Sequence, residues 1–186
     1  MADRRRRRKR RRPLLAVFGW TLLLLAAFFA VFVAAPAVSG TVRIADGAMN
    51  PALETGDRVA VDRLRYLLTD PKRGDIVQFT ADSGSGQTLV RRVVALPGET
   101  VQISDGQIYI NGVPLDESDY TTGTIQYSGT ASLPLTLSAD EYFVMCDNRS
   151  GNFDSRDPTV GNVSKADITG RVFLRVAPRD RFGPVR

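Results

Sequence analysis

The chain has 186 residues, of which 43% are hydrophobic, so it is long enough to form one domain with a substantial core. It contains no histidine, which excludes Ser-His-Asp and Cys-His catalysis and most zinc sites. Its single cysteine, Cys146, excludes an intramolecular disulfide and is of a type usually found as a small core residue. The composition therefore indicates neither a metal nor an organic cofactor.

The net charge of +5 is concentrated near the N-terminus. Residues 4–12 are nine consecutive basic residues; without them and Asp3, the remainder has 16 basic and 19 acidic residues, a net charge of −3. Leu14 to Ala35 follow, 22 uncharged and mostly apolar residues, enough to cross a hydrocarbon core of ~30 Å as a helix. This neighbour argues against a nucleic-acid partner for the basic run and in favour of a membrane, with the basic end in the cytoplasm.

We therefore predict three parts for a single-pass cell-membrane protein. Residues 1–13 form a cytoplasmic basic segment, residues 14–36 a transmembrane helix, and residues 37–186 an extracytoplasmic domain. The alternative is a cleavable signal peptide, because Ala35-Pro36-Ala37 has the small-x-small pattern of a cleavage site. The apolar stretch is longer than the ~7–15 residues typical of signal peptides, which favours a retained anchor.

The extracytoplasmic part has the pattern of a mainly antiparallel β domain. Short β-branched or alternating runs end at Gly, Asp or Pro, namely VRIA, DRVAVDRL, GDIVQFTA, TLVRRVVA, DEYFVM and GRVFLRV. Residues 99–139 read as a hairpin-rich insertion. Asp105-Gly106 and Asn111-Gly112 favour the positive φ angles of tight hairpin turns, whereas residues 116–139 suggest surface loops with at most one strand. Short helices are expected only near 62–69 and 164–168.

Several motifs follow one another in an order that points to a family. They are GAMNPAL at 47–53, GDIVQF at 74–79, RRVVALPGE at 91–99, CDNRSGNFDSRD at 146–157 and GNVSKADITGRV at 161–172. Together they resemble the bacterial type I signal peptidases, membrane-anchored serine proteases that remove signal peptides from exported proteins. The resemblance covers most of residues 40–178 and implies a signal peptidase I-like β fold.

The resemblance also implies where the catalytic groups of the family would lie. The family's serine nucleophile precedes the Met of S-M-x-P, which places it at Ala48. Its lysine base falls at Arg91, its lysine-orienting serine at Asn152, and the glycine before D-N-R at Cys146. A serine needs a neighbouring base, and lysine is a base only when burial lowers its pKa far below ~10. Neither a methyl group nor an arginine can perform these roles.

Other motif positions keep residues expected to support the site. The loop around the nucleophile position contains Asp46, Gly47, Met49 and Pro51, and the structural motif contains Asp147, Arg149, Asp154 and Arg156. Because a buried guanidinium needs a carboxylate partner, Arg91 is expected to pair with Asp46 or Asp154. The competing interpretation is that Arg91 extends into solvent.

These observations predict a catalytically inactive, signal peptidase I-like membrane protein. By resemblance, it would bind exported precursors or pilin-like subunits, as an accessory of a sortase-type pilus assembly system. An alternative is a signal peptidase that is an engineered Ser→Ala form or that uses another nucleophile, with Lys165 as a distant base; the candidates are Ser150, Ser155 and Cys146. A third possibility is an anchored domain with a purely structural role.

Overall fold

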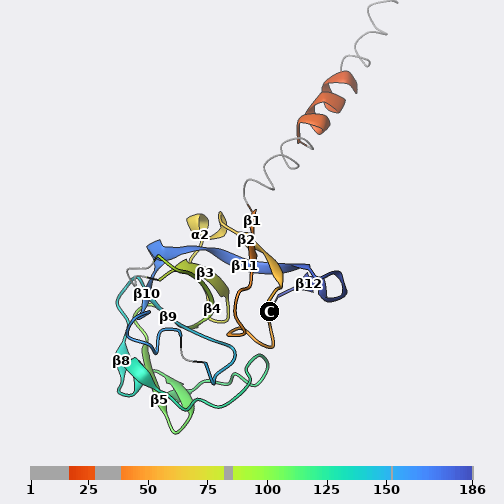
Figure 1. The fold of residues 1–186 in the computed structure, drawn as a ribbon. Coiled ribbons are helices and arrows are strands. Elements are labelled where there is room, and N and C mark those ends of the chain that lie inside the picture. The colour runs from red at the N-terminus through yellow and green to blue at the C-terminus, as the bar shows by residue number, and fades with distance from the viewer. Residues whose placement is uncertain (1–16, 28–38, 82–85, 152, 186) are drawn as a thin grey trace, which may run out of the picture. The chain divides into compact units, whose positions relative to one another are not determined.

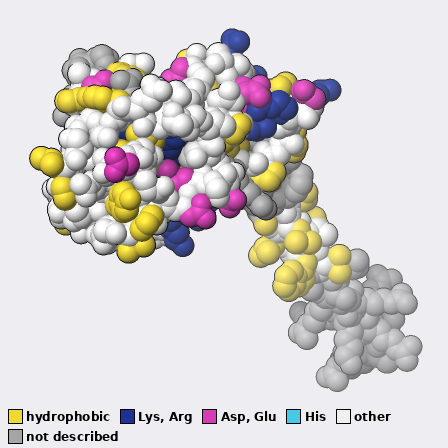
Figure 2. Space-filling view, turned by 90° about the horizontal axis from the view of Figure 1, so that it is seen from below, with side chains coloured by type: hydrophobic (Ala, Val, Ile, Leu, Met, Phe, Trp, Pro, Cys, Tyr) yellow, Lys and Arg dark blue, Asp and Glu magenta, His cyan; other side chains and the backbone are white. Residues whose placement is uncertain are grey.

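The computed structural model describes residues 17–27, 39–81, 86–151 and 153–185. The chain divides into two compact units, Met1–Ser39 and Gly40–Arg186. In the first unit, residues 17–27 are helical and their large apolar side chains are exposed (Figure 2). No helix among the described residues is long and apolar enough to cross a membrane. The predicted span 14–36 extends beyond this helix at both ends, and residues 14–16 and 28–36 lie outside the described residues.

The second unit is built on an antiparallel sheet with the order β1-β2-β11-β3-β4-β9-β10, in which β12 pairs with β11 (Figure 1). Its strands are β1 (Ser39–Arg43), β2 (Arg58–Asp62), β3 (Ile76–Thr80), β4 (Thr88–Ala95), β9 (Glu141–Met145), β10 (Val163–Ser164), β11 (Ile168–Ala177) and β12 (Gly183–Pro184). The predicted β-branched runs supply the long central strands. The predicted strand at 170–176 is longer than expected, and β10 and β12 were not predicted.

A second antiparallel sheet has the order β7-β6-β5-β8. Its strands are β5 (Thr100–Ser104), β6 (Gln107–Ile110), β7 (Val113–Pro114) and β8 (Leu135–Thr136). Asp105 and Gly106 have φ angles of 52° and 76°, and Asn111 and Gly112 have 52° and 80°. Two consecutive positive φ angles make a two-residue hairpin turn that matches strand twist. Both predicted turns are therefore confirmed.

In the described part of the second unit, helices are few and short. They are α2 (Arg65–Leu68) and three 3-10 turns, η1 (Gly129–Ala131), η2 (Lys165–Asp167) and η3 (Arg179–Arg181). α2 and η2 confirm the helical segments expected near 62–69 and 164–168. The stretch 116–139, predicted as loops with at most one strand, contains η1 and the two-residue β8.

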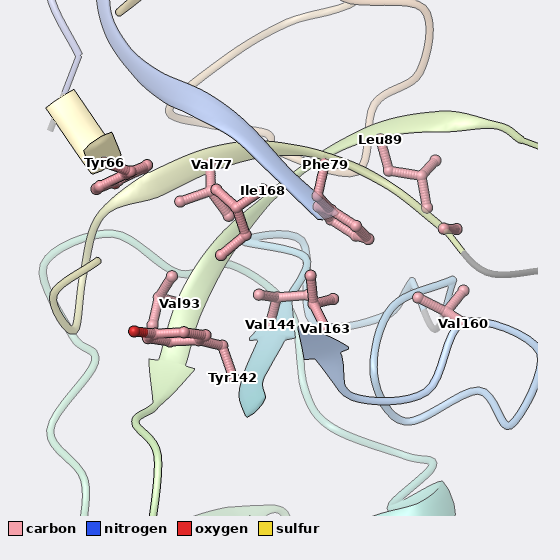
Figure 3. Packing of buried hydrophobic residues seen from close by; sticks show 11 residues of the cluster. Tyr66, Val77, Phe79, Leu89, Val93, Tyr142, Val144, Val160, Val163 and Ile168 are labelled. Carbon is pink, nitrogen blue, oxygen red and sulfur yellow. The ribbon is translucent and has the colours of Figure 1, made fainter. Parts of the chain in front are cut away.

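Buried apolar side chains form three clusters that hold these elements together. Figure 3 shows the first, in which Tyr66 of α2 packs with side chains of β3, β4, β9 and β11. A second joins Val94 and Met145 of the main sheet to Ile103 and Ile108 of the second sheet. The third cluster packs the loop before β2 against β2, β3 and β11, and it contains Ile44, Met49, Leu53, Val59, Val61, Ile76, Val90, Val172 and Val185. This third cluster fixes the loop that carries Ala48.

Candidate functional site

The loop that resembles a protease nucleophile loop is held by its two apolar side chains. Met49 and Leu53 are fully buried, and Leu53 N donates to Met49 O at 2.8 Å. Gly47 O accepts from Asn50 N at 3.2 Å, and the exposed Pro51 follows a cis peptide bond. These contacts leave Ala48 half-buried at the turn, so the nucleophile position presents a methyl group.

Asp46 links this turn to the neighbouring strand. Its Oδ1 accepts a hydrogen bond from Ala48 N at 3.2 Å, and its Oδ2 lies 3.3 Å from Arg91 Nη2. The Asp46 carboxylate therefore accepts a hydrogen bond from the backbone N–H at the nucleophile position and also forms an ion pair with the guanidinium at the base position. The Asp46 side chain remains 51% exposed, so solvent weakens its attraction for Arg91.

Arg91 on β4 is 1% exposed and makes three contacts. Besides Asp46, it donates from Nε to Phe153 O at 2.9 Å and from Nη1 to Val90 O at 2.7 Å. The predicted ion pair of Arg91 with Asp46 or Asp154 is confirmed, with Asp46 as the partner, and the competing interpretation that Arg91 extends into solvent is wrong. Two carbonyls complete the hydrogen bonding of this buried cation, which a single half-exposed carboxylate does not satisfy alone.

Asp154, the other expected partner of Arg91, pairs with Arg156 instead. Arg156 donates from Nε at 2.9 Å and Nη2 at 2.7 Å, and Cys146 N donates to the same carboxylate at 2.9 Å. Burial raises the pKa of Asp154, but these donors outweigh burial and hold its pKa below the ordinary value. The pair braces the loop that follows β9, next to Phe153.

A second buried ion pair, between Arg92 and Asp147, starts from the face of β4 opposite to Arg91, because consecutive strand residues point to opposite faces. Arg92 donates to Asp147 from Nε at 2.7 Å and from Nη2 at 2.6 Å, and Tyr120 stacks over its guanidinium at 4.2 Å. Arg149 pairs with Glu117. Asp147, Arg149, Asp154 and Arg156 are thus all buried in ion pairs.

Residues 117–122 were expected to be surface loop, but they support the site through hydrogen bonds that no local sequence pattern indicates. Thr122 N donates to Asp147 O at 3.0 Å and its hydroxyl to Asn50 O at 3.2 Å, while Arg149 N donates to Thr122 O at 2.8 Å. Asn148 N also donates to Ala48 O at 2.9 Å. These partners are remote in sequence, so local pattern carries no signal for them.

Two of the three alternative nucleophiles are poorly placed. Cys146 is 1% exposed, and burial raises the pKa of its thiol to about 12 despite the nearby charge of Arg91. Ser155 is fully buried and its Oγ accepts from Val144 N at 3.0 Å. Ser150 is exposed. Lys165 pairs with Asp70 at 2.5 Å, and this hydrogen bond raises the pKa of the lysine, the opposite of what a base needs. Asn152 lies outside the described residues.

One edge of the first half of β4, beside this loop, pairs with none of the described strands. Residues 88–92 pair with β3, whereas pairing with β9 begins only at Arg92. Val93 exchanges backbone hydrogen bonds with Gly74 and Asp75 on the β3 side. Because backbone groups alternate in direction along a strand, those of Thr88 and Val90 face the other edge. No described strand pairs there, and Val90 O accepts the hydrogen bond from Arg91 Nη1.

Comparison with protein families matches residues 17–177 to the signal peptidase family, peptidase S26. The chain belongs to this family. It is 34% identical to a signal peptidase I of Leptolyngbya laminosa over 73% of this chain and 67% of that protein. It is 32% identical to a probable signal peptidase I-2 of Synechocystis sp. over 75% of this chain and 64% of that one. The chain thus spans about two thirds of the length of these relatives.

A solved signal peptidase I from Enterococcus faecalis V583 aligns with 55% of this chain and 97% of its own, at 35% identity and a TM-score of 0.44. Residues 40–186 of this chain form the mainly antiparallel β fold that the sequence predicts.

Proposed function

We propose that this member of the signal peptidase family is held at the membrane and binds exported precursors, among them pilin-type subunits. It does not cleave them by the serine–lysine mechanism. The observation that carries the proposal is that Ala48 lies at the nucleophile position and Arg91 at the base position. Asp46 accepts a hydrogen bond from Ala48 N and forms an ion pair with Arg91. A methyl group cannot attack a carbonyl, and an arginine with a pKa above ~12 cannot accept the serine proton.

Two of the three candidate nucleophiles are unsuited to this chemistry. Cys146 is buried with a raised pKa, so its reactive thiolate is scarce at neutral pH. The hydroxyl of Ser155 is buried and already accepts a backbone hydrogen bond. Ser150 is the exposed candidate, and among the described residues the candidate base Lys165 is engaged by Asp70.

Peptide binding is supported by a strand edge that does not depend on the residues at positions 48 and 91. An extended peptide can add to a free strand edge through backbone hydrogen bonds, and among the described strands none occupies one edge of the first half of β4. Arg91 partly occupies this edge through Val90 O, so a ligand that pairs there must displace one hydrogen bond of the guanidinium. We therefore expect the parent chain to bind peptides with small side chains at alternate positions, and the Arg91→Lys variant to bind them more tightly.

The test measures cleavage and binding side by side with the full chain in detergent. A preprotein and its fluorescent cleavage-site peptide are incubated with the parent, with Arg91→Lys, and with a triple variant, Asp46→Asn/Ala48→Ser/Arg91→Lys. The Asp46→Asn change is included because a carboxylate next to a lysine keeps it charged. We expect binding without cleavage by the parent and cleavage by the triple variant.

Cleavage by the parent at the small-x-small site would refute the proposal, and a Ser150→Ala variant would then show whether that hydroxyl is the nucleophile. A peptide with bulky residues at the same alternate positions serves as the binding control. The proposal would also be wrong if the parent bound both peptides with equal affinity, or if neither the parent nor Arg91→Lys bound the peptide. An anchored domain with a structural role would then be the remaining explanation.

A further inference from the structure

The second sheet and the loop that follows β7 line a hollow of about 720 Å³. The β5–β6 hairpin supplies one part of its wall, residues between 114 and 125 supply another, and Arg149 supplies a third. Apolar side chains in this wall are those of Ile108, Leu115 and Ile125, which are buried or half-buried. We refer to this space as the second-sheet hollow.

The part of the chain around the hollow is acidic throughout. Residues 99–139 contain no Lys or Arg, and their acidic residues are Glu99, Asp105, Asp116, Glu117 and Asp119. Of these, Asp105, Asp116 and Glu117 line the hollow. Figure 2 views the domain from the side on which β5 lies in Figure 1, and acidic side chains gather on this face.

Two of the three carboxylates in the hollow lack a counter-ion among the described residues. Glu117 pairs with Arg149, whereas Asp105 and Asp116 are exposed and accept hydrogen bonds from neighbouring serines. The backbone N–H and the hydroxyl of Ser118 hold the pKa of Asp116 below its ordinary value, so this group is charged at neutral pH. The hollow therefore keeps two negative charges, which attract a cation.

Arg149 is a second feature of the hollow that points to a ligand. The residue is 2% exposed, and its Nη2 pairs with Glu117. Its Nε and Nη1 are buried and have no hydrogen-bond partner in the described part of the chain. Because a buried donor without a partner is unfavourable, an acceptor such as a peptide carbonyl is favoured next to this guanidinium.

These groups together match a basic residue of a peptide. Among the described residues, no three Asp, Glu or Cys side chains are grouped so that they could hold a metal ion, and the carboxylates of the hollow therefore favour an organic cation. The apolar wall suits the aliphatic stem of a lysine or arginine, whose charged end can remain at the exposed carboxylates. The backbone of the same peptide supplies the carbonyl that the guanidinium lacks.

The hollow adjoins the loop that resembles a protease nucleophile loop. Thr121 and Gly123 line the hollow, and the hydroxyl of Thr122 between them donates to Asn50 O at 3.2 Å. Asn50 lies two residues after Ala48. A peptide that extends past Ala48 thus meets the hollow next.

We propose that the second-sheet hollow binds a lysine or arginine side chain of the exported client, with Asp105 and Asp116 at the cation and Arg149 at a carbonyl oxygen. The inference rests on the proposed function, because the client is the peptide that binds along β4. It adds a requirement for a basic residue, outside the segment with small side chains, to the preference for small residues at alternate positions.

The test measures the anisotropy of four fluorescent peptides with the full chain in detergent. Two peptides have small residues at alternate positions and two have bulky residues there, and within each pair the flanks contain either lysines or glutamines. Asp105→Asn/Asp116→Asn removes both unpaired charges and leaves the buried ion pair of the hollow intact. Asp119→Asn/Asp140→Asn is the matched control, because it makes the same change in net charge at two exposed carboxylates that do not line the hollow.

The parent should bind the small-residue peptide with lysines about two- to tenfold more tightly than its glutamine partner at low salt, since ion pairs with exposed carboxylates are individually weak. This preference should disappear in Asp105→Asn/Asp116→Asn and persist in the control variant. Unfolding midpoints equal to that of the parent would show that both variants fold. Loss of the preference in both variants, or in neither, would overturn the inference.

The four peptides also separate this inference from the proposed function. Binding of the small-residue peptides without a preference for lysine would overturn the inference and leave the proposed function standing. An equal preference for lysine in both pairs, with no preference for small over bulky residues, would refute the proposed function and support the hollow as a site for basic side chains. No binding of any of the four peptides would overturn both.

Discussion

We expect the loss of the buried ion pair between Asp154 and Arg156 to destabilise the loop beside Arg91 more than the loss of any other contact there. In an Asp154→Asn variant, one acceptor oxygen becomes an amide donor that faces Arg156 Nη2, Arg156 Nε or Cys146 N, all within 2.9 Å of the carboxylate. Both side chains of the pair are at most 1% exposed, so the guanidinium is left charged and without a counter-ion in the interior. Breaking a buried pair in this way costs about 3–5 kcal/mol.

The assay is thermal unfolding of the full chain in detergent, followed by circular dichroism. A change of 1 kcal/mol shifts the midpoint by about 2–4 °C in a protein of this size, so the expected loss is about 6–20 °C. Asp70→Asn is the control, because it removes the carboxylate of an ion pair whose side chains are 76% and 42% exposed. Such pairs contribute about 0–1 kcal/mol.

The pH dependence gives an independent measurement of the same contact. The folded-state pKa of Asp154 lies below the ordinary value, so its contribution is present above the unfolded-state pKa of about 3.9 and is lost as the pH falls through the folded value. The parent should therefore lose stability below about pH 4 more steeply than Asp154→Asn. A variant within about 1 kcal/mol of the parent at neutral pH would refute the reasoning and mean that desolvation cancels the attraction.

Two further predictions concern the thiol and the packing of β11. With a pKa of about 12, Cys146 should react with iodoacetamide at pH 8 roughly a thousandfold more slowly than a free thiol, and a rate within tenfold of that reference would contradict its burial. In β11, a Cβ at Gly170 would lie 2.7 Å from Asp62 O, so Gly170→Ala should lower the urea midpoint by an amount equivalent to about 1–3 kcal/mol. Gly183→Ala, where nothing lies within 4 Å, should leave the midpoint nearly unchanged.

The sequence was sufficient wherever a property depends on neighbouring residues or on residue type. Asp105-Gly106 and Asn111-Gly112 specify their turns because few other pairs tolerate two consecutive positive φ angles. The absence of histidine and the residues at 48 and 91 already restrict the chemistry, since a methyl group and a guanidinium have fixed properties in any fold.

Only the tertiary structure decided which groups meet across the chain. Asp46 and Asp154 were equally acceptable partners for Arg91 by charge, and the fold assigns Asp46 because Asp154 is already bound by Arg156 two residues away. Thr122 and Glu117 reach the site from a stretch that has no regular pattern of its own. The free edge of β4 depends on where pairing with β9 begins, which the local alternation of side chains does not specify.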